Sequence, residues 1–168
     1  MRYIHPTAII YDNVMLGDNI YIGPFCIIGA PAEILATRPD NPSGFVIIGD
    51  GVWLEGHVTV DSGQSNNRRT CILDHCYLMK QTHVGHDSVL EAHCILSPGA
   101  RIGGECYLRN HVNVGMNAVI HQQSYIPSKC MIGMGAVVTK KAAQEMQEVE
   151  TWAGNPAKRI GPNKKWRT

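Results

Sequence analysis

The sequence has no long apolar run and no apolar segment near its beginning. Its first ten residues, MRYIHPTAII, do not contain the apolar stretch of a signal peptide. Because the sequence has no run of roughly 18 or more apolar residues, we expect no helix that spans a membrane. These two absences predict a cytoplasmic protein.

Charged and aromatic residues are also scarce. Charged residues make up 17% of the 168 residues and aromatic residues 7%, whereas an average domain is about 25% charged. The formal net charge of +1 argues against a nucleic-acid partner, because such proteins usually carry a basic excess or stripe. Glycine is abundant at 17 residues, which favours a regular, turn-rich fold with small side chains inside.

An aliphatic residue recurs at every sixth position over most of the chain. The longest unbroken run covers residues 72–138, and the same spacing occurs over residues 4–28 and 48–60. The residue four positions after each aliphatic one is mostly small or β-branched. A period of six fits neither an α-helix nor an alternating strand. It predicts a prism of stacked coils, in which three hexads of one short strand and one turn make a coil of about 18 residues.

The cysteines and several histidines fit this repeat. Nearly all the cysteines occupy the small inward position, which predicts buried free thiols and no disulfides. These are Cys26, Cys76, Cys94, Cys106 and Cys130, and only Cys71 lies outside that register. His75, His93 and His111 are 18 residues apart, so we expect them to stack on one corner. No spacing typical of a zinc site is present, and no metal is expected.

Two segments interrupt the repeat. Residues 30–45 and 63–71 break the hexads and are predicted to be loops that leave the scaffold, which is a common location for binding residues. The second loop contains Arg68 and Arg69, and we assign both to substrate binding because guanidinium groups suit phosphates. A tolerated surface insertion is the alternative for either loop.

The repeat ends before the last part of the chain. Residues 140–150 are predicted to form a short helix or an irregular cap. Because the open end of a prism exposes core and strand edges, apolar residues must cover it. The candidates are Met146, Val149 and Trp152. The predicted organisation is a β-helix over residues 1–141 and a C-terminal cap with a cofactor-closing tail over residues 142–168.

The hexapeptide repeat resembles that of the left-handed β-helix acyltransferases, and the resemblance covers nearly the whole chain. It implies an all-β, left-handed parallel β-helix that forms homotrimers, with each active site between two prisms. The segment HVGHDSVLEAHCILSPGARIGG, residues 83–104, is similar to the catalytic coil of two groups. One is the acyl-carrier-protein-dependent UDP-N-acetylglucosamine acyltransferases of lipid A synthesis. The other is the coenzyme-A-dependent acetyltransferases of nucleotide-linked amino sugars.

The resemblance assigns roles to individual residues. His86 matches the general base that deprotonates the acceptor, a task that suits imidazole because its pKa is near neutrality. Asp87 matches an acid that follows this base in many members and orients the ring. His83 and His121 match positions near the bound substrates and are predicted to bind substrate. A further histidine of the first group falls where this chain has Glu105, so that role is not carried over.

The end of the chain favours coenzyme A as the donor. AGNPAKRI, residues 153–160, is similar to the tail that closes over coenzyme A in hexapeptide acetyltransferases. The lipid A group instead carries a C-terminal helical domain, which we do not expect in this chain. Met134 replaces a glycine of the long-acyl enzymes, which predicts a short acyl group. The residues predicted to bind acetyl-CoA as co-substrate are Met116, Met134, Gly135, Lys140, Asn155, Lys158 and Arg159.

The expected activity is therefore transfer of an acetyl or short acyl group from coenzyme A to an amine or hydroxyl of a sugar, most simply a nucleotide-linked one. An acyl-carrier-protein-dependent UDP-sugar acyltransferase is the alternative. A γ-carbonic anhydrase is less favoured, because its three zinc-ligand positions fall on Thr59, His86 and Glu91, of which one is histidine. A scaffold without catalysis is a further alternative. The sequence does not distinguish an amine acceptor from a hydroxyl acceptor.

Overall fold

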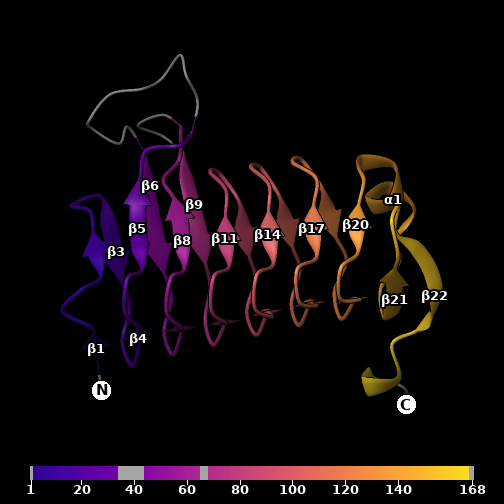
Figure 1. Cartoon of the computed structure of the whole chain (residues 1–168), viewed down its shortest axis with the longest axis horizontal. Helices are drawn as coiled ribbons and strands as arrows, with labels where there is room; N and C mark the ends of the chain where they lie inside the picture. The colour runs from indigo at the N-terminus through magenta and orange to yellow at the C-terminus, as the bar shows by residue number, and fades with distance from the viewer. Residues whose placement is uncertain (1, 34–43, 65–67, 167–168) are drawn as a thin grey trace.

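The chain forms a triangular prism of stacked coils (Figure 1). The computed structural model describes residues 2–33, 44–64 and 68–166. Most of the predicted loop 30–45 and part of the predicted loop 63–71 therefore lie outside the described residues. Each coil visits three parallel sheets in turn, and backbone amides bond to the next coil, as from Tyr77 N–H to the Cys94 carbonyl at 2.9 Å.

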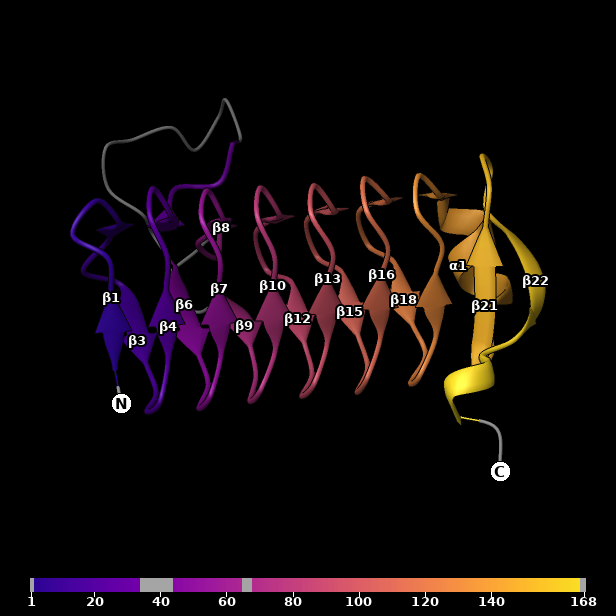
Figure 2. The same ribbon diagram turned by 60° about the horizontal axis from the view of Figure 1, so that its bottom comes forward.

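The three faces of the prism are sheets A, B and C, whose strands alternate along the axis (Figure 2). Sheet A contains β1 (Tyr3–Ile4), β4 (Tyr21–Ile22), β7 (Trp53–Leu54), β10 (Tyr77–Leu78), β13 (Ile95–Leu96), β16 (Asn113–Val114), β19 (Met131–Ile132), β21 (Glu150–Ala153) and β22 (Lys158–Pro162). Sheet B contains β2 (Ile9–Ile10), β5 (Ile27–Ala30), β8 (Thr59–Asp61), β11 (His83–Val84), β14 (Arg101–Ile102), β17 (Val119–Ile120) and β20 (Val137–Val138). Sheet C contains β3 (Val14–Leu16), β6 (Phe45–Ile48), β9 (Arg69–Ile72), β12 (Val89–Leu90), β15 (Tyr107–Leu108) and β18 (Tyr125–Ile126).

The predicted aliphatic register points into the prism. Leu90, Leu96 and Ile102 are fully buried and belong to one continuous core. All six cysteines are free and buried, as predicted. Ile4 was also assigned to the inward register but is 37% exposed. It lies on β1, which pairs with β4 alone in this structure, and burial in such a prism depends on neighbouring coils on both sides.

The predicted histidine stack forms on the corner between sheets C and A. The rings of His75 and His93 have centroids 5.1 Å apart, and those of His93 and His111 are 4.8 Å apart. The short 3-10 helix η2 (Lys164–Trp166) returns to this corner and brings Trp166 to 4.8 Å from His111. This ladder is explained as turn residues of successive coils that pack on one another.

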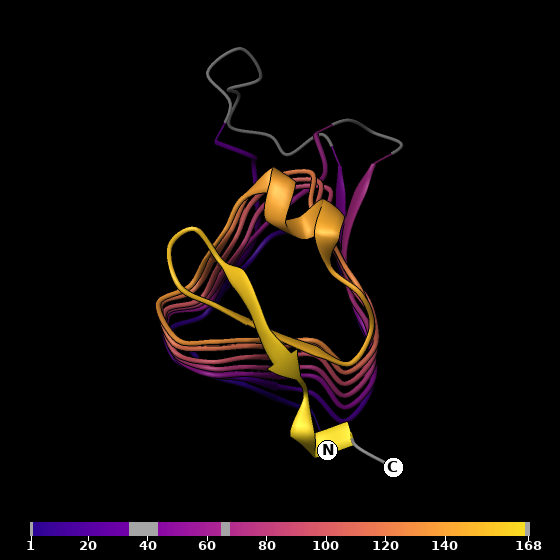
Figure 3. The same cartoon turned by 90° about the vertical axis from the view of Figure 1, so that its right-hand side faces the viewer.

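The C-terminal end of the prism is closed by α1 (Lys140–Glu145) and by the β21–β22 pair (Figure 3). Two of the residues expected to cover the core, Met146 and Trp152, are each 4% exposed, and Val149 is half-buried at a turn. Strand β21 adds parallel to β19, so it continues sheet A beyond the last regular coil. Among the described residues, no helix has the length and apolar character needed to cross a membrane.

Candidate active site

One corner of the prism carries the predicted catalytic pair and most of the irregular structure. It is the corner where sheet B passes into sheet C, and both interruptions of the repeat fall there, between β5 and β6 and between β8 and β9. Figure 3 shows that α1 also lies on this corner. The regular turns and the added segments therefore meet along a single edge.

His86 and Asp87 form the turn that follows β11. The backbone of Asp87 is left-handed, with a φ of 59°, and its amide donates to Thr70 Oγ1 at 2.9 Å. This turn holds the Asp87 carboxylate 2.9 Å from His86 Nδ1, with side chains that are 6% and 17% exposed. A carboxylate that binds Nδ1–H fixes the tautomer and leaves Nε2 as the nitrogen that can accept a proton.

The imidazole of His86 is held between the next coil and the second interrupted segment. It lies against Gly104, where an added Cβ would come within 2.4 Å of Nε2. The side-chain amide nitrogen of Gln64 lies 3.0 Å from Nδ1 and 3.1 Å from Nε2. An acceptor that uses Nε2 must therefore share this position with the Gln64 amide or displace it.

The two predicted phosphate-binding arginines lie beside this pair. Arg68 Nη1 is 3.4 Å from Asp87 Oδ2 and 3.7 Å from Glu105 Oε2, and half of its side chain is exposed. With Arg69 and Tyr107 these groups line a hollow of about 230 Å³. The hollow thus carries two arginines and two carboxylates, and Arg68 is already paired with both acids.

Another pair of ionisable side chains, Asp61 and His83, was missed by the sequence analysis. Asp61 ends β8, is 8% exposed, and has Oδ2 3.8 Å from His83 Nε2. His83 Nδ1 shares a hydrogen bond of 2.8 Å with Thr59 Oγ1. Burial raises the pKa of Asp61 to about 7, with Glu33 adding to the effect and His86 opposing it. Burial lowers the pKa of His83, which favours its neutral form.

A signal for Asp61 was present in the repeat. In the next two coils, glycine follows the buried aliphatic residue of sheet B, as Gly85 and Gly103. At the coil before them this position is Asp61, and at the coil after them it is His121. The two glycines therefore add no side chains between a carboxyl group and an imidazole, and we call this stretch of backbone the glycine floor. They also let successive coils approach closely, because an added Cβ would come 2.7 Å from Gly104 N at Gly85 and 2.6 Å from Gln122 N at Gly103.

His121 lies at the far end of this glycine floor. Its side chain is exposed, and Nδ1 donates to the backbone carbonyl of Gln122 at 2.7 Å. With Nδ1 as the donor, the neutral ring has Nε2 available to accept a hydrogen bond. His83 lies on β11, His86 at the turn that follows β11, and His121 directly after β17, so the three histidines lie on sheet B and on the side that leads to sheet C.

The residues predicted to bind the donor do not gather on this corner. Met116 and Met134 are 45% and 71% exposed and lie at the turns between sheets A and B, where Gly135 has a φ of 64°. Asn155 belongs to the turn that joins β21 to β22 and lies on the same side, because the neighbouring Gly154 carbonyl accepts from Val137 N–H. Sheet B separates these residues from His86.

The three predicted cations are dispersed as well. Arg159 contacts the carboxylate of Glu150 within the cap. Burial alone would raise the pKa of Glu150, but hydrogen bonds from Gln147, Trp152 and Arg159 lower it overall. Lys158 is exposed on β22. Arg159 therefore has a structural partner that the sequence analysis did not foresee.

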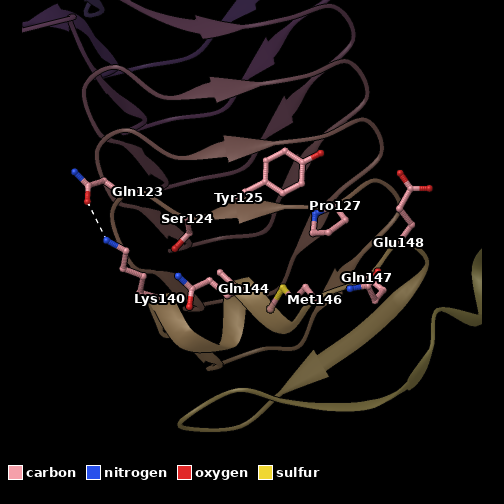
Figure 4. Close-up of a pocket in the computed structure, with 10 residues that line it drawn as sticks. Gln123, Ser124, Tyr125, Pro127, Lys140, Gln144, Met146, Gln147 and Glu148 are labelled. Atoms are coloured by element: carbon pink, nitrogen blue, oxygen red, sulfur yellow. Dashed lines mark hydrogen bonds between the residues drawn. The ribbon is translucent and has the colours of Figure 1, made fainter.

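Lys140 is the exception, because it begins α1 on the corner that carries His86. Its Nζ donates to Gln123 Oε1 at 3.3 Å (Figure 4). Both residues line a hollow of about 370 Å³ between α1 and β18, together with Tyr125 and Met146. Gln123 and Asp87 occupy equivalent left-handed turn positions two coils apart. The corner thus carries a second hollow beyond the His86 turn.

Possible metal ligands do not converge in the described ranges. Over residues 2–33, 44–64 and 68–166, no group of three or more His, Cys, Asp or Glu side chains is arranged to hold a metal ion. The three positions that correspond to anhydrase ligands include the hydroxyl of Thr59, which instead bonds to His83.

Comparison with solved structures identifies the fold. The chain overlays on LpxA from Acinetobacter baumannii with a TM-score of 0.71 and 24% identity, over 96% of this chain and 72% of that one. For the UDP-N-acetylglucosamine acyltransferase from Campylobacter jejuni the TM-score is 0.73 and the identity 22%, over 95% and 75% of the two chains. This chain is a left-handed parallel β-helix of hexapeptide repeats. The predicted fold and its handedness are confirmed.

Sequence comparison gives shorter matches, and no family model matches the chain. The acyl-[acyl-carrier-protein]–UDP-N-acetylglucosamine O-acyltransferase of Rickettsia canadensis is 40% identical over 58 residues, or 34% of this β-helix and 17% of that protein. The protein of the same name from Campylobacter lari is 30% identical in an alignment of 127 residues. That alignment covers 54% of this chain and 48% of that protein. The β-helix thus spans less than half the length of these curated relatives.

Proposed function

We propose that this protein is an acyltransferase that moves an acyl group from a thioester to a nucleotide-linked amino sugar. The observation that carries the proposal is the His86–Asp87 pair, with Nδ1 and Oδ2 2.9 Å apart beside two arginines. The names of the curated relatives, which are UDP-N-acetylglucosamine O-acyltransferases, support the same chemistry.

In this proposal His86 Nε2 accepts the proton of the acceptor as its oxygen or nitrogen attacks the thioester carbonyl. Asp87 orients the ring and stabilises the imidazolium that forms. The tetrahedral oxyanion needs a hydrogen-bond donor. The backbone N–H of Gly115, which follows β16, cannot serve as this donor, because it already donates to the Ile132 carbonyl at 2.8 Å. Gly104 N–H has no such backbone acceptor among the described residues and lies beside the His86 ring, so we assign it this role.

We propose an acyl-carrier protein as the donor in preference to coenzyme A. The sequence favoured coenzyme A, but the curated relatives named above are called after an acyl-carrier-protein donor. Arg159, which was expected at the phosphates of coenzyme A, contacts Glu150 instead. Coenzyme A stays as the alternative donor, supported by the similarity of the tail at residues 153–160.

We also propose that the protein works as a homotrimer. A flat prism face does not enclose a ligand, so a cleft requires a neighbouring surface. Met116, Met134 and Asn155 lie across sheet B from His86, and a threefold arrangement with one repeated interface lets a neighbour bring such residues to the catalytic corner. Light scattering is expected to give three times the mass of the 18.5 kDa chain.

The test of the activity is thiol release from acyl-carrier-protein thioesters and from acetyl-CoA, with UDP-N-acetylglucosamine and related nucleotide sugars as acceptors. His86→Ala is expected to lower turnover by roughly 100- to 10,000-fold, the usual contribution of a general base. The matched control is His93→Asn, because His93 lies on the corner between sheets C and A, away from both edges of sheet B, and asparagine tolerates its left-handed φ of 61°. Equal turnover of wild type and His86→Ala would refute the assignment of the base.

A further inference from the structure

We propose that Asp61, supported by His83, binds the amino group of the acceptor and so selects an amine over a hydroxyl as the nucleophile. The inference rests on the proposed acyl transfer and adds to it the chemical class of the acceptor group. The Asp61 carboxyl is the only acidic group in the glycine position of sheet B among the described coils, and it lies at the edge of the floor formed by Gly85 and Gly103.

The position of Asp61 places it inside the reaction site. Its carboxyl faces His83 Nε2 at 3.8 Å, and it is close enough to His86 for a charge on that ring to lower the Asp61 pKa. A group bound between Asp61 and His86 would lie over backbone to which Gly85 and Gly103 add no side chain. The nucleophilic atom of an acceptor must lie in this region if His86 is to take its proton.

The chemistry of Asp61 favours a cationic ligand. A carboxylate that is 8% exposed needs a charged or multiply hydrogen-bonded partner to offset its lost hydration. In the described part of the chain, no Lys or Arg nitrogen lies within 4.0 Å of it. Burial and Glu33 raise the pKa of Asp61 to about 7, so the unliganded site holds a carboxyl that a bound ammonium would ionise.

The neighbours of Asp61 do not supply this cation themselves. His83 is held through Nδ1 by Thr59, and burial lowers its pKa, so it stays neutral near pH 7. Arg101, on the adjacent strand β14, donates to the carbonyl of Gln81, which lies at the edge of sheet B shared with sheet A. A hydroxyl acceptor would give Asp61 one neutral hydrogen bond, whereas an ammonium gives a charge-assisted bond that is about twice as strong.

The proposed step balances as follows. The bound ammonium loses one proton to solvent through Asp61 and becomes a neutral amine. The amine nitrogen attacks the thioester carbonyl, His86 takes the second proton, and a C–N bond forms as the C–S bond breaks. Imidazolium then returns its proton to the departing thiolate. The products are an amide, a free thiol and one proton.

The experiment compares two acceptors with the complete protein: UDP-N-acetylglucosamine and its analogue with an amino group in place of the acceptor hydroxyl. We expect wild-type kcat/KM to be at least about 10-fold higher for the amino analogue. Asp61→Asn, which keeps the shape but not the charge, should lose at least about 10-fold on the amino analogue and less than about threefold on the hydroxyl one. His86→Ala should lose activity on both.

The outcomes separate this inference from the proposed function. Faster transfer to the hydroxyl, or an equal loss on both acceptors in Asp61→Asn, would overturn the inference and leave the acyltransferase intact. No transfer to either acceptor from any donor would overturn both. A measurement on the wild-type protein tests the inference even if the Asp61→Asn variant does not fold. Binding of the amino analogue at pH 6 should release protons, because Asp61 ionises. Calorimetry in buffers of different ionisation enthalpy measures this release. Binding without proton release would contradict the role of Asp61.

Discussion

Replacing Asp61 by Asn should change how the stability of the protein depends on pH. In the folded chain burial raises the pKa of this carboxyl from 3.8 to about 7, whereas in the unfolded chain it keeps its ordinary value. Between these two pKa values the folded state binds more protons than the unfolded state, so the contribution of Asp61 to stability falls as pH rises. The loss is complete once the pH exceeds the folded value.

The size of the effect follows from the two pKa values. Each pKa unit corresponds to about 1.36 kcal/mol, so a shift of about three units is worth about 4 kcal/mol at high pH. Part of this, about 1.6 kcal/mol, is already lost at pH 5, because the unfolded carboxyl is ionised there. The remaining change between pH 5 and pH 8 is about 2 to 3 kcal/mol. Asn removes the ionisation, and with it this part of the pH dependence.

The assay is denaturant unfolding of wild type and Asp61→Asn at pH 5 and pH 8. Protein concentration is held fixed, because association contributes to stability. The variant should gain about 2 kcal/mol on wild type between the two pH values, and the subtraction cancels the titration of groups that the two proteins share. A difference between the two proteins that stays constant within about 0.5 kcal/mol would show that Asp61 ionises freely, and the reasoning about its burial would be wrong.

Three further variants test the other assignments. Gly104→Ala should lower turnover by about 10-fold or more, because its Cβ would meet His86 Nε2 at 2.4 Å. The control is Gly56→Ala, whose Cβ would lie 3.3 Å from Pro24. Equal turnover of the two variants would contradict the packing of the His86 ring against Gly104. Arg159→Ala should lower the free energy of unfolding by about 1 kcal/mol or less through the lost Glu150 contact. The KM of the donor should stay unchanged. A large rise in the KM for acetyl-CoA would instead support coenzyme A as the donor. Gln64→Ala should keep turnover within about threefold of wild type if its amide only covers His86, and a loss comparable to that of His86→Ala would assign Gln64 to catalysis.

The fold was predictable because one short pattern determines it. Each aliphatic residue of the repeat, such as Leu90 or Ile102, meets its equivalent one coil away, so a single spacing defines the strand, the turn and the stacking partner. The same logic placed the histidine ladder. The first coil was less predictable, because β1 pairs with β4 alone and the burial of Ile4 depends on neighbouring coils on both sides.

The candidate site was predictable only where a motif recorded it. His86 and Asp87 are adjacent in the sequence, so their contact follows from one turn. Asp61 and His83 are 22 positions apart, and their contact depends on the register between β8 and β11. The break in the repeat begins just after Asp61, which obscured the fact that an acid replaced the glycine of that position. The contact of Arg159 with Glu150 was not foreseen for a similar reason, since Glu150 belongs to the preceding strand of the cap and the contact depends on the register between β21 and β22.

The predicted site residues are divided between the two edges of sheet B, and this division limits where a donor can bind. The base, the arginines and α1 lie on the edge shared with sheet C, and the exposed methionines and the β21–β22 turn lie on the edge shared with sheet A. The strands between them are two or three residues long in the coils that carry His83 and Asp61, and each is paired with both neighbouring strands, so the two edges belong to one continuous sheet. A thioester donor that contacts both sets must lie across the outer face of sheet B or between two copies of the chain. A donor on the outer face of sheet B would leave the reacting carbonyl in water, whereas a donor between two copies would be shielded from water. For this reason the catalytic corner and the trimer are proposed together.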